Sequence, residues 1–234
     1  MWLTFEYAPA SLFSLKPARA TSTAGTTLLI PTPYAVKMAF LDAALRHGLA
    51  ASADEVVGWL ARATLRIGPP RHACVTGTIQ TVRQETRDAE HKRKADAPPY
   101  RATIALREVV HYEGSLRVAF DLTTCAEELV ALLFRAAPAI NYFGKRGSFV
   151  QYRGGTPLAD LDSRFTRPAD DAGADGQRAA LDDFGAKASF AALNSFGPGV
   201  VKRNIDRRFV ETSIPLRVLN SGPGFVHYSA PPTE

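Results

Sequence analysis

Residues 100–122, YRATIALREVVHYEGSLRVAFDL, contain two strand-like runs that are joined by a tight turn. Apolar and polar side chains alternate over 100–112 and again over 115–122, which is typical of strands with one buried face. Glu113-Gly114 between the runs suits the turn of an antiparallel hairpin. A third alternating run, at about 72–82, precedes them. The centre of the chain therefore predicts an antiparallel sheet.

A charged segment separates the run at 72–82 from the run at 100–112. It has no apolar stripe and is bracketed by strand-like runs, so we interpret residues 83–101 as the end of a long inserted hairpin. We expect this end to be partly disordered without a ligand. Its cations and its histidine are Arg83, Arg87, His91, Lys92, Arg93 and Lys94.

Outward from this sheet, helices and further strands complete the order of elements. The expected strands lie at 2–8, 139–152 and 208–218, and the expected helices run from Thr32 to Gly48, from Ser52 to Gly68 and over 126–137. The hydroxyl groups of Thr32, Ser52 and Thr124 can each cap a helix start. The resulting βαββαβ order, with its hairpin insertion, predicts an α+β, ferredoxin-like (RRM-like) domain. A sheet of this kind can present an open face to single-stranded RNA.

Composition separates this domain from two other segments. Residues 156–183 are rich in Asp, Ala and Gly, with seven Asp between positions 160 and 183, so we expect an exposed excursion there. The domain then comprises residues 1–155 and 184–220, and residues 221–234 form a C-terminal tail.

The overall composition narrows the class of protein. The chain has 234 residues with 46% apolar and 22% charged residues, which fits one large globular domain without a membrane span. Its net charge is +5, and Arg supplies 21 of its 28 cations. Because the Arg guanidinium donates paired hydrogen bonds to phosphate and stacks on bases, nucleic acid is the expected partner. Cys74 and Cys125 lack CxxC spacing, which argues against a disulfide framework or a zinc site and fits a reducing cytoplasm.

The segment 141–152, NYFGKRGSFVQY, carries the clearest binding signal. Two glycines flank a Lys-Arg pair, and aromatic residues stand on both sides. Glycines let backbone amides approach phosphate, the cations Lys145 and Arg146 neutralise it, and a ring such as that of Tyr142 can stack on a base. The same pattern is also compatible with a turn whose cations are only solvated.

Four features together resemble the fifth family of CRISPR-associated proteins: the short first strand, the basic loop after it, TPYAVK at 32–37 and YFGKRGSF at 142–149. The resemblance covers roughly residues 1–152, and the Asp-rich segment 156–183 has no counterpart in it. Members of this family belong to the RAMP superfamily and hold the 5′ handle of crRNA in type I Cascade complexes. The resemblance implies a ferredoxin-like fold, a hairpin "thumb" at 83–101 that inserts into the guide RNA, and a role in antiviral defence. The implied partners are crRNA and the large and backbone subunits, with target DNA reached only through the complex.

The candidate RNA contacts combine these signals. Lys37 is placed near the N-terminus of the first helix, where it can face a phosphate. A basic loop with Lys202, Arg203, Arg207 and Arg208 suits contact with RNA or with a neighbouring subunit. The full set is Lys16, Arg19, Tyr34, Lys37, Arg83, Arg87, Lys92, Arg93, Lys94, Tyr142, Lys145, Arg146, Lys202 and Arg203.

We expect a protein without catalytic activity, metal or cofactor, and two alternatives stay open. Some members of the family cut precursor RNA without metal, using a Tyr, a Lys and a His, and Tyr34, His91 and Lys92 supply these residue types. A His can accept the 2′-hydroxyl proton and a Lys can stabilise the phosphorane. The second alternative is an unrelated basic RRM-like RNA-binding protein. No GxSxG, P-loop, HExxH or suitably placed GxGxxG motif favours another enzyme class.

Overall fold

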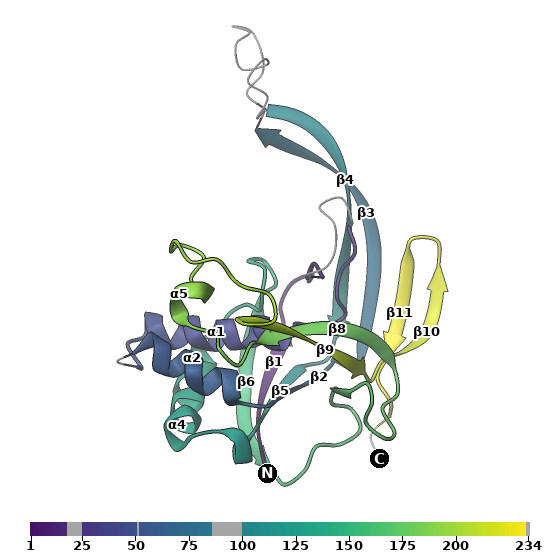
Figure 1. Cartoon of the computed structure of the whole chain (residues 1–234). Coiled ribbons are helices and arrows are strands. Elements are labelled where there is room, and N and C mark those ends of the chain that lie inside the picture. The colour runs from purple at the N-terminus through teal and green to yellow at the C-terminus, as the bar shows by residue number, and fades with distance from the viewer. Residues whose placement is uncertain (18–24, 51, 86–99, 233–234) are drawn as a thin grey trace, which may run out of the picture.

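The computed structural model describes residues 1–17, 25–50, 52–85 and 100–232 of the chain (Figure 1). Its core is a four-stranded antiparallel sheet of β1 (Trp2–Pro9), β2 (Leu65–Gly68), β5 (Leu116–Asp121) and β6 (Val150–Leu158), in the spatial order β2-β5-β1-β6. Helices α1 (Pro33–Arg46) and α2 (Ala53–Arg62) connect β1 to β2, and α4 (Glu127–Ala136) connects β5 to β6. This order and connectivity are those of a ferredoxin-like α+β fold, which confirms the predicted fold class.

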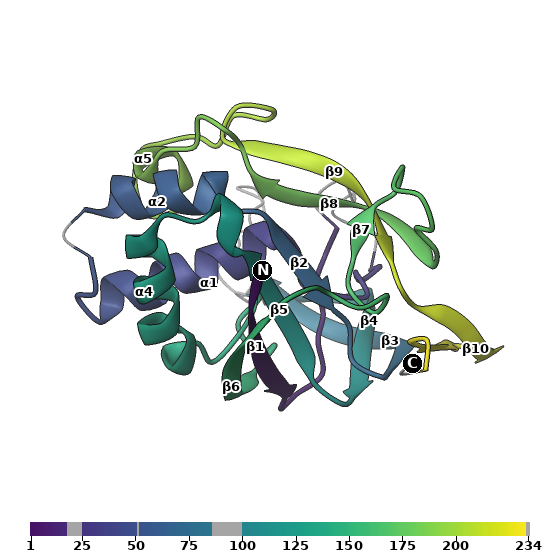
Figure 2. The same cartoon turned by 90° about the horizontal axis from the view of Figure 1, so that it is seen from below.

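The helices pack on one face of the core sheet (Figure 2). Phe5 of β1 lies beneath them, with its ring centroid 5.6 Å from that of Phe40 in α1 and 5.7 Å from that of Phe134 in α4. Phe40 also meets Phe120 of β5 edge-on at 5.2 Å. These aromatic contacts join two strands and two helices that are far apart in the sequence.

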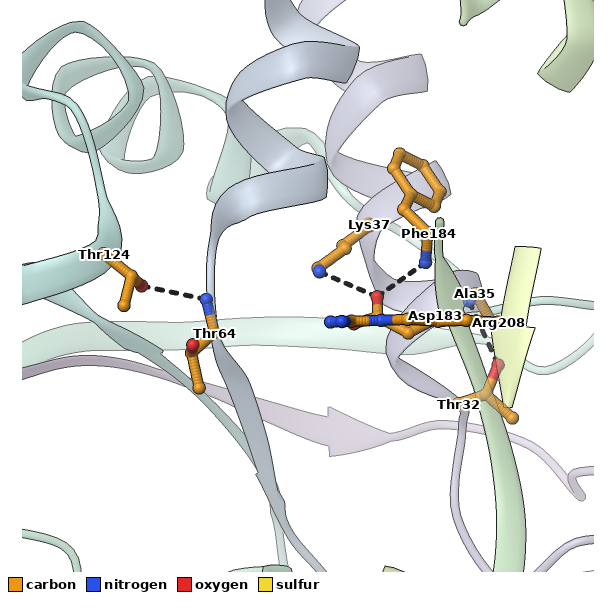
Figure 3. A network of polar contacts seen from close by, with 8 residues as sticks. All are labelled: Thr32, Ala35, Lys37, Thr64, Thr124, Asp183, Phe184 and Arg208. Atoms are coloured by element: carbon orange, nitrogen blue, oxygen red, sulfur yellow. Dashed lines mark hydrogen bonds and ion pairs between the residues drawn. The ribbon is translucent and has the colours of Figure 1, made fainter. Parts of the chain in front are cut away.

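Two of the three predicted helix caps are present. The Thr32 hydroxyl accepts a hydrogen bond from Ala35 N at 3.2 Å, and the Ser52 hydroxyl accepts one from Glu55 N at 3.3 Å. Thr124 differs, because its hydroxyl accepts from Thr64 N at 2.9 Å, which ties the end of β5 to the start of β2 (Figure 3). Ala126 precedes α4 without a side-chain cap.

The second core strand is shorter and earlier than the sequence predicts. The second helix ends at Arg62 rather than near Gly68, and Leu65–Gly68 pairs with β5. Leu65 and Ile67 are buried beneath the helices, but four residues are too few for a clear alternating pattern. The run at 72–82 therefore starts a second sheet instead of completing the first.

This second sheet contains the predicted long hairpin. Strands β3 (His72–Glu85) and β4 (Tyr100–Glu113) pair along their whole length and project away from the core as an arm (Figure 1). Residues 86–99, which include Arg87, His91, Lys92, Arg93 and Lys94, lie outside the described residues. Two C-terminal strands, β10 (Arg217–Gly222) and β11 (Phe225–Ser229), complete the order β10-β11-β3-β4. The expected tail thus includes a strand that pairs with the base of the arm.

A third sheet, in the order β7-β9-β8, contains β7 (Arg167–Pro168), β8 (Gln177–Phe184) and β9 (Arg207–Ile214), with the short helix α5 (Phe190–Leu193) between β8 and β9. The expected strand at 208–218 is therefore divided between β9 and β10, which belong to different sheets. The expected excursion at 156–183 is only partly exposed, since Leu181, Asp182 and Asp183 at the end of β8 are buried against α1. Burial of the two carboxylates is possible because each is paired with a cation.

The segment after β6 covers the other face of the core sheet. It leaves β6 at one edge and reaches β2 at the opposite edge, where Thr166 N donates to Ile67 O at 2.9 Å. Phe165 lies under the Arg117 guanidinium of β5, at 4.4 Å. Thr4 and Ala119, which point away from the helices, are only 7% and 0% exposed. The expectation of an open face for RNA is therefore wrong in the centre of this sheet.

The two cysteines are free thiols, and Cys125 has an unusual environment. Burial, partly opposed by a hydrogen bond with Thr124, raises the pKa of Cys125 to about 11. Because the thiolate is the reactive form, we expect alkylation of Cys125 at pH 8 to be slower than that of an ordinary thiol by about a hundredfold. Mass spectrometry of the folded protein after iodoacetamide treatment measures this rate, with urea-unfolded protein as the control. Rapid complete labelling of folded Cys125 would contradict the prediction.

Candidate functional site

A cavity of about 640 Å³ lies along α1, beginning at its capped N-terminal end. One wall comes from the side of α1 that carries Thr32, Ala35, Met38, Ala39 and Asp42, which recur at helical spacing. The opposite side of α1, with Val36 and Phe40, faces the core. The remaining wall residues are Ser14, Leu15, Lys16, Leu28, Tyr34, Tyr142, Gly144, Lys145, Asp182, Leu193, Ser195, Phe196 and Arg207.

The predicted glycine turn forms part of the cavity rim. Gly144 and Gly147 have φ values of 71° and 99°, the left-handed conformation that glycine adopts without strain. Ser148 N donates to Lys145 O at 3.0 Å, and Phe149 N donates to the Ser11 hydroxyl at 2.8 Å. These bonds fix the turn. The predicted strand at 139–152 accordingly starts only at Val150, because the two glycines turn the chain before it.

A buried aromatic ring packs the same turn against the core. Phe143 is fully buried and meets Tyr7 of β1 edge-on at 5.0 Å. Tyr142 and Lys145, on either side of Phe143 and Gly144, line the cavity. Arg146 is exposed at the same turn but does not line the cavity, so only part of the Lys-Arg pair faces it.

Tyr34 anchors the inner wall. Its ring meets Phe184 of β8 edge-on at 5.3 Å, and the Arg207 guanidinium lies 4.6 Å from its centroid. Arg207 is fixed in turn, since its Nε donates to the Asp182 carboxylate at 2.6 Å. Burial raises the pKa of Tyr34, and the nearby Arg207 charge only partly opposes this. The phenol is therefore a hydrogen-bond donor at neutral pH and is poorly suited to act as a base.

The structure brings four of the predicted contacts to one place. Lys16 and Lys145 are exposed cations on the rim, and Tyr34 and Tyr142 supply rings. They come from the loop after β1, from α1 and from the turn before β6, which are remote in sequence. Arg83 of the arm is exposed elsewhere, and Lys202 and Arg203 are exposed in the loop before β9. Arg19 lies outside the described residues.

Lys37 is not available as a phosphate contact in this structure. Its side chain is 0% exposed, and its Nζ lies 2.7 Å from the Asp183 carboxylate (Figure 3). The same carboxylate accepts from Phe184 N at 2.7 Å and from Arg208 Nη2 at 2.9 Å. Burial lowers the pKa of Lys37, and Asp183 counteracts this effect. The interpretation of Lys37 as an RNA contact is therefore replaced by a structural role that joins α1 to β8.

Several residues of the cavity wall were not among the candidates. Asp182 enters from β8 and Phe196 from the loop after α5, whereas Arg207 of β9 was expected in a basic loop but not in this cavity. The basic run at 202–208 is a sequence signal for Arg207, but nothing local indicates that it meets Tyr34. Asp42 and Asp182 add two carboxylates, which accept hydrogen bonds from the hydroxyl or amino groups of a ligand.

The residues of the nuclease alternative are not assembled in the described part of the chain. Tyr34 lines the cavity, whereas His91 and Lys92 lie outside the described residues. Among the histidines that the structure describes, at positions 47, 72, 111 and 227, none lines the cavity. Within the described ranges, no helix has the length and apolar character needed to cross a membrane.

The chain was compared with protein families, curated proteins and solved structures. No protein-family model and no curated protein matches the chain. Among solved structures, the chain is similar to the crystal structure of a CRISPR protein from Archaeoglobus fulgidus, with a TM-score of 0.48 and 14% sequence identity. The match covers 99% of this chain and 92% of that one.

Proposed function

We propose that this protein is a non-catalytic RNA-binding subunit of a type I CRISPR interference complex, which caps the 5′ handle of crRNA and anchors neighbouring subunits. The observation that carries the proposal is the cavity along α1, which gathers Lys16, Tyr34, Tyr142 and Lys145. The residues were selected from sequence for RNA binding, and three separate segments bring them to one concave site.

The chemistry of the cavity suits the end of a single RNA strand. Lys16 and Lys145 neutralise phosphate, and the cavity begins at the N-terminal end of α1, which is the positive end of the helix dipole. Tyr142 offers a ring for a base. The partly exposed Asp42 carboxylate, which is paired with Arg46, can accept a further hydrogen bond from a hydroxyl or amino group, and a nucleotide has both.

The arm supports the anchoring role. On one face of β3 and β4, Ile79, Ile104 and Leu106 are 77%, 76% and 52% exposed. Ile79 is paired with Leu106, so these side chains lie close together. Exposed apolar clusters of this kind are typical of protein contacts, which fits docking against the large and backbone subunits in the cytoplasm. Target DNA would be reached only through that complex.

RNA titration tests the cavity. In the double variant Lys16→Ala/Lys145→Ala, we expect weaker binding to guide RNA. The slope of log affinity against log salt concentration should also become shallower by about 1.4, because each lost phosphate contact removes about 0.7. The double variant Arg62→Ala/Arg135→Ala removes the same charge from exposed positions on α2 and α4 and serves as the control. Equal affinity and equal slope in both double variants would remove the cavity from the RNA site.

Incubation of the purified chain with repeat RNA in EDTA tests the absence of catalysis. We expect intact RNA, because the described part of the cavity lacks a histidine and because Tyr34 holds its proton. A cleaved product that disappears in Tyr34→Phe would establish the metal-independent endoribonuclease instead. Copurified RNA of one fixed length class would distinguish a guide-binding role from general RNA binding.

A further inference from the structure

Cations and aromatic rings alternate along the outside of β9, starting inside the cavity. The Arg207 guanidinium lies 4.6 Å from the Tyr34 ring centroid and 5.9 Å from that of Phe209. The Arg203 guanidinium lies 5.1 Å from the same Phe209 ring. Four side chains from α1, β9 and the loop before β9 thus form a continuous row.

An exposed aromatic residue stands at the mouth of the cavity beside this row. Phe196 lines the cavity and is 94% exposed. Its loop, residues 195–205, also carries the exposed cations Lys202 and Arg203. An exposed ring at the mouth of the cavity is free to stack on a base, and the cations of the same loop favour an anionic ligand.

The end of this loop is held in place, so the row is a built surface. Lys202 N donates to the buried Asp206 carboxylate at 2.8 Å, and Asp206 N donates back to Lys202 O at 2.9 Å. Gly185 N donates to Asp206 O at 2.8 Å, which ties the loop to the chain after β8. Arg203 therefore projects from a fixed turn and is already oriented over Phe209.

We infer that Phe196, Arg203, Arg207 and Phe209 form a second RNA-contacting surface, the β9 track, which binds the nucleotides next to the one held in the cavity. This inference rests on the proposed RNA binding. Bases stack on exposed rings and on guanidinium planes, and cations follow the phosphates, which is how proteins bind single strands without reading their sequence. The same loop also exposes the apolar side chains of Val200 and Ile205, which a protein partner would cover. The arginines stacked beside the rings of Tyr34 and Phe209 favour RNA as the occupant, and a protein partner is an outcome of the test.

A length series separates the β9 track from the cavity. We expect the affinity of the wild-type protein to rise from a dinucleotide to single-stranded RNA of about 12 nucleotides, because longer strands reach the track. In Lys202→Ala/Arg203→Ala, whose positions are exposed and lie outside the cavity wall, dinucleotide binding should stay unchanged, and the affinity for the longer strand should fall by about fivefold to a hundredfold. NMR titration measures the dinucleotide and fluorescence anisotropy the longer strand.

Conservative variants identify the interaction. Phe196→Tyr should retain binding because it keeps the ring, whereas Phe196→Leu should lose it although it remains apolar. Arg203→Lys should keep the salt dependence but lose affinity, because an ammonium does not stack as a guanidinium plane does. Both positions are exposed, so these substitutions should leave the fold intact. Arg135→Ala on α4 is the charge-matched control.

The experiment distinguishes failure of the β9 track from failure of the proposed RNA binding. If the wild-type protein binds no RNA of any length, the proposed function fails. If it binds the dinucleotide but the double variant binds the longer strand as tightly as the wild type, the β9 track is overturned while the cavity stands. Loss of a protein partner with unchanged RNA binding would also overturn the inference and assign the loop to a subunit interface.

Discussion

Asp183→Ala is expected to lower the free energy of unfolding by about 3–5 kcal/mol, because it leaves the ammonium of Lys37 buried without a counter-charge. The Lys37 side chain is 0% exposed, and Asp183 is its ion-pair partner at 2.7 Å. The variant also removes the acceptor of Phe184 N and the partner of Arg208. Urea-induced unfolding followed by circular dichroism measures the loss.

The other half of the pair should behave differently. In Lys37→Met, Asp183 keeps Arg208 at 2.9 Å and Phe184 N at 2.7 Å, so its carboxylate stays paired. Removal of one partner of a buried ion pair is costly mainly when the other charge is left unpaired, and since Asp183 keeps Arg208 we expect a change within about 1 kcal/mol. The double variant Lys37→Met/Asp183→Ala should therefore be more stable than Asp183→Ala alone.

An exposed carboxylate provides the matched control for this pair. Asp160→Ala removes the same group from an exposed position and should change stability by less than about 0.5 kcal/mol. Equal effects of Lys37→Met and Asp183→Ala would show that Lys37 is not the group left uncompensated. The buried pair would then contribute through packing rather than through charge.

Local sequence signals predicted the parts of the fold that local chemistry determines. The caps at Thr32 and Ser52 start helices because a hydroxyl satisfies free amides within three residues, which is visible in the sequence. The turn at Gly144 and Gly147 could likewise be predicted, because it depends on two glycines that are close together in the sequence. The arm follows from two long alternating runs, and together these signals led to the ferredoxin-like order.

Features that depend on pairing between distant segments were missed. Leu65–Gly68 becomes a strand only because β5 pairs with it. Lys37 stands four residues before Leu41, on the buried side of α1, which is a signal for burial. Its counter-charge, however, lies 146 positions away at Asp183, and no local pattern links the two.

The candidate site also combines residues that local sequence signals identify with residues that only distant pairing brings in. Lys16, Tyr34, Tyr142 and Lys145 could be selected from residue type and loop chemistry, and the structure gathers them. Asp182 could not be assigned to the cavity, because it lies in a segment that looked Asp-rich and exposed, and Arg207 was expected only as part of a basic loop. Its burial depends on ion pairs that form only when β8 reaches α1.

Filling the cavity without changing its charge should have the largest effect on RNA binding. Ala39 lies on the cavity side of α1, and in Ala39→Trp an indole would occupy the space that we assign to a nucleotide. We expect the affinity for guide RNA to fall by about thirtyfold to a thousandfold, since the contacts of a whole nucleotide are lost. Fluorescence anisotropy at fixed salt measures the change.

A second indole on another helix shows whether the effect is specific. Ala131 is exposed on α4, so Ala131→Trp adds the same side chain away from the cavity and should leave the affinity unchanged. Lys16 and Lys145 remain in Ala39→Trp, so its residual binding should keep most of the salt dependence, unlike that of the double alanine variant. Wild-type affinity in Ala39→Trp would mean that RNA is held by the basic rim alone, because a ligand seated in the cavity cannot share that space with an indole.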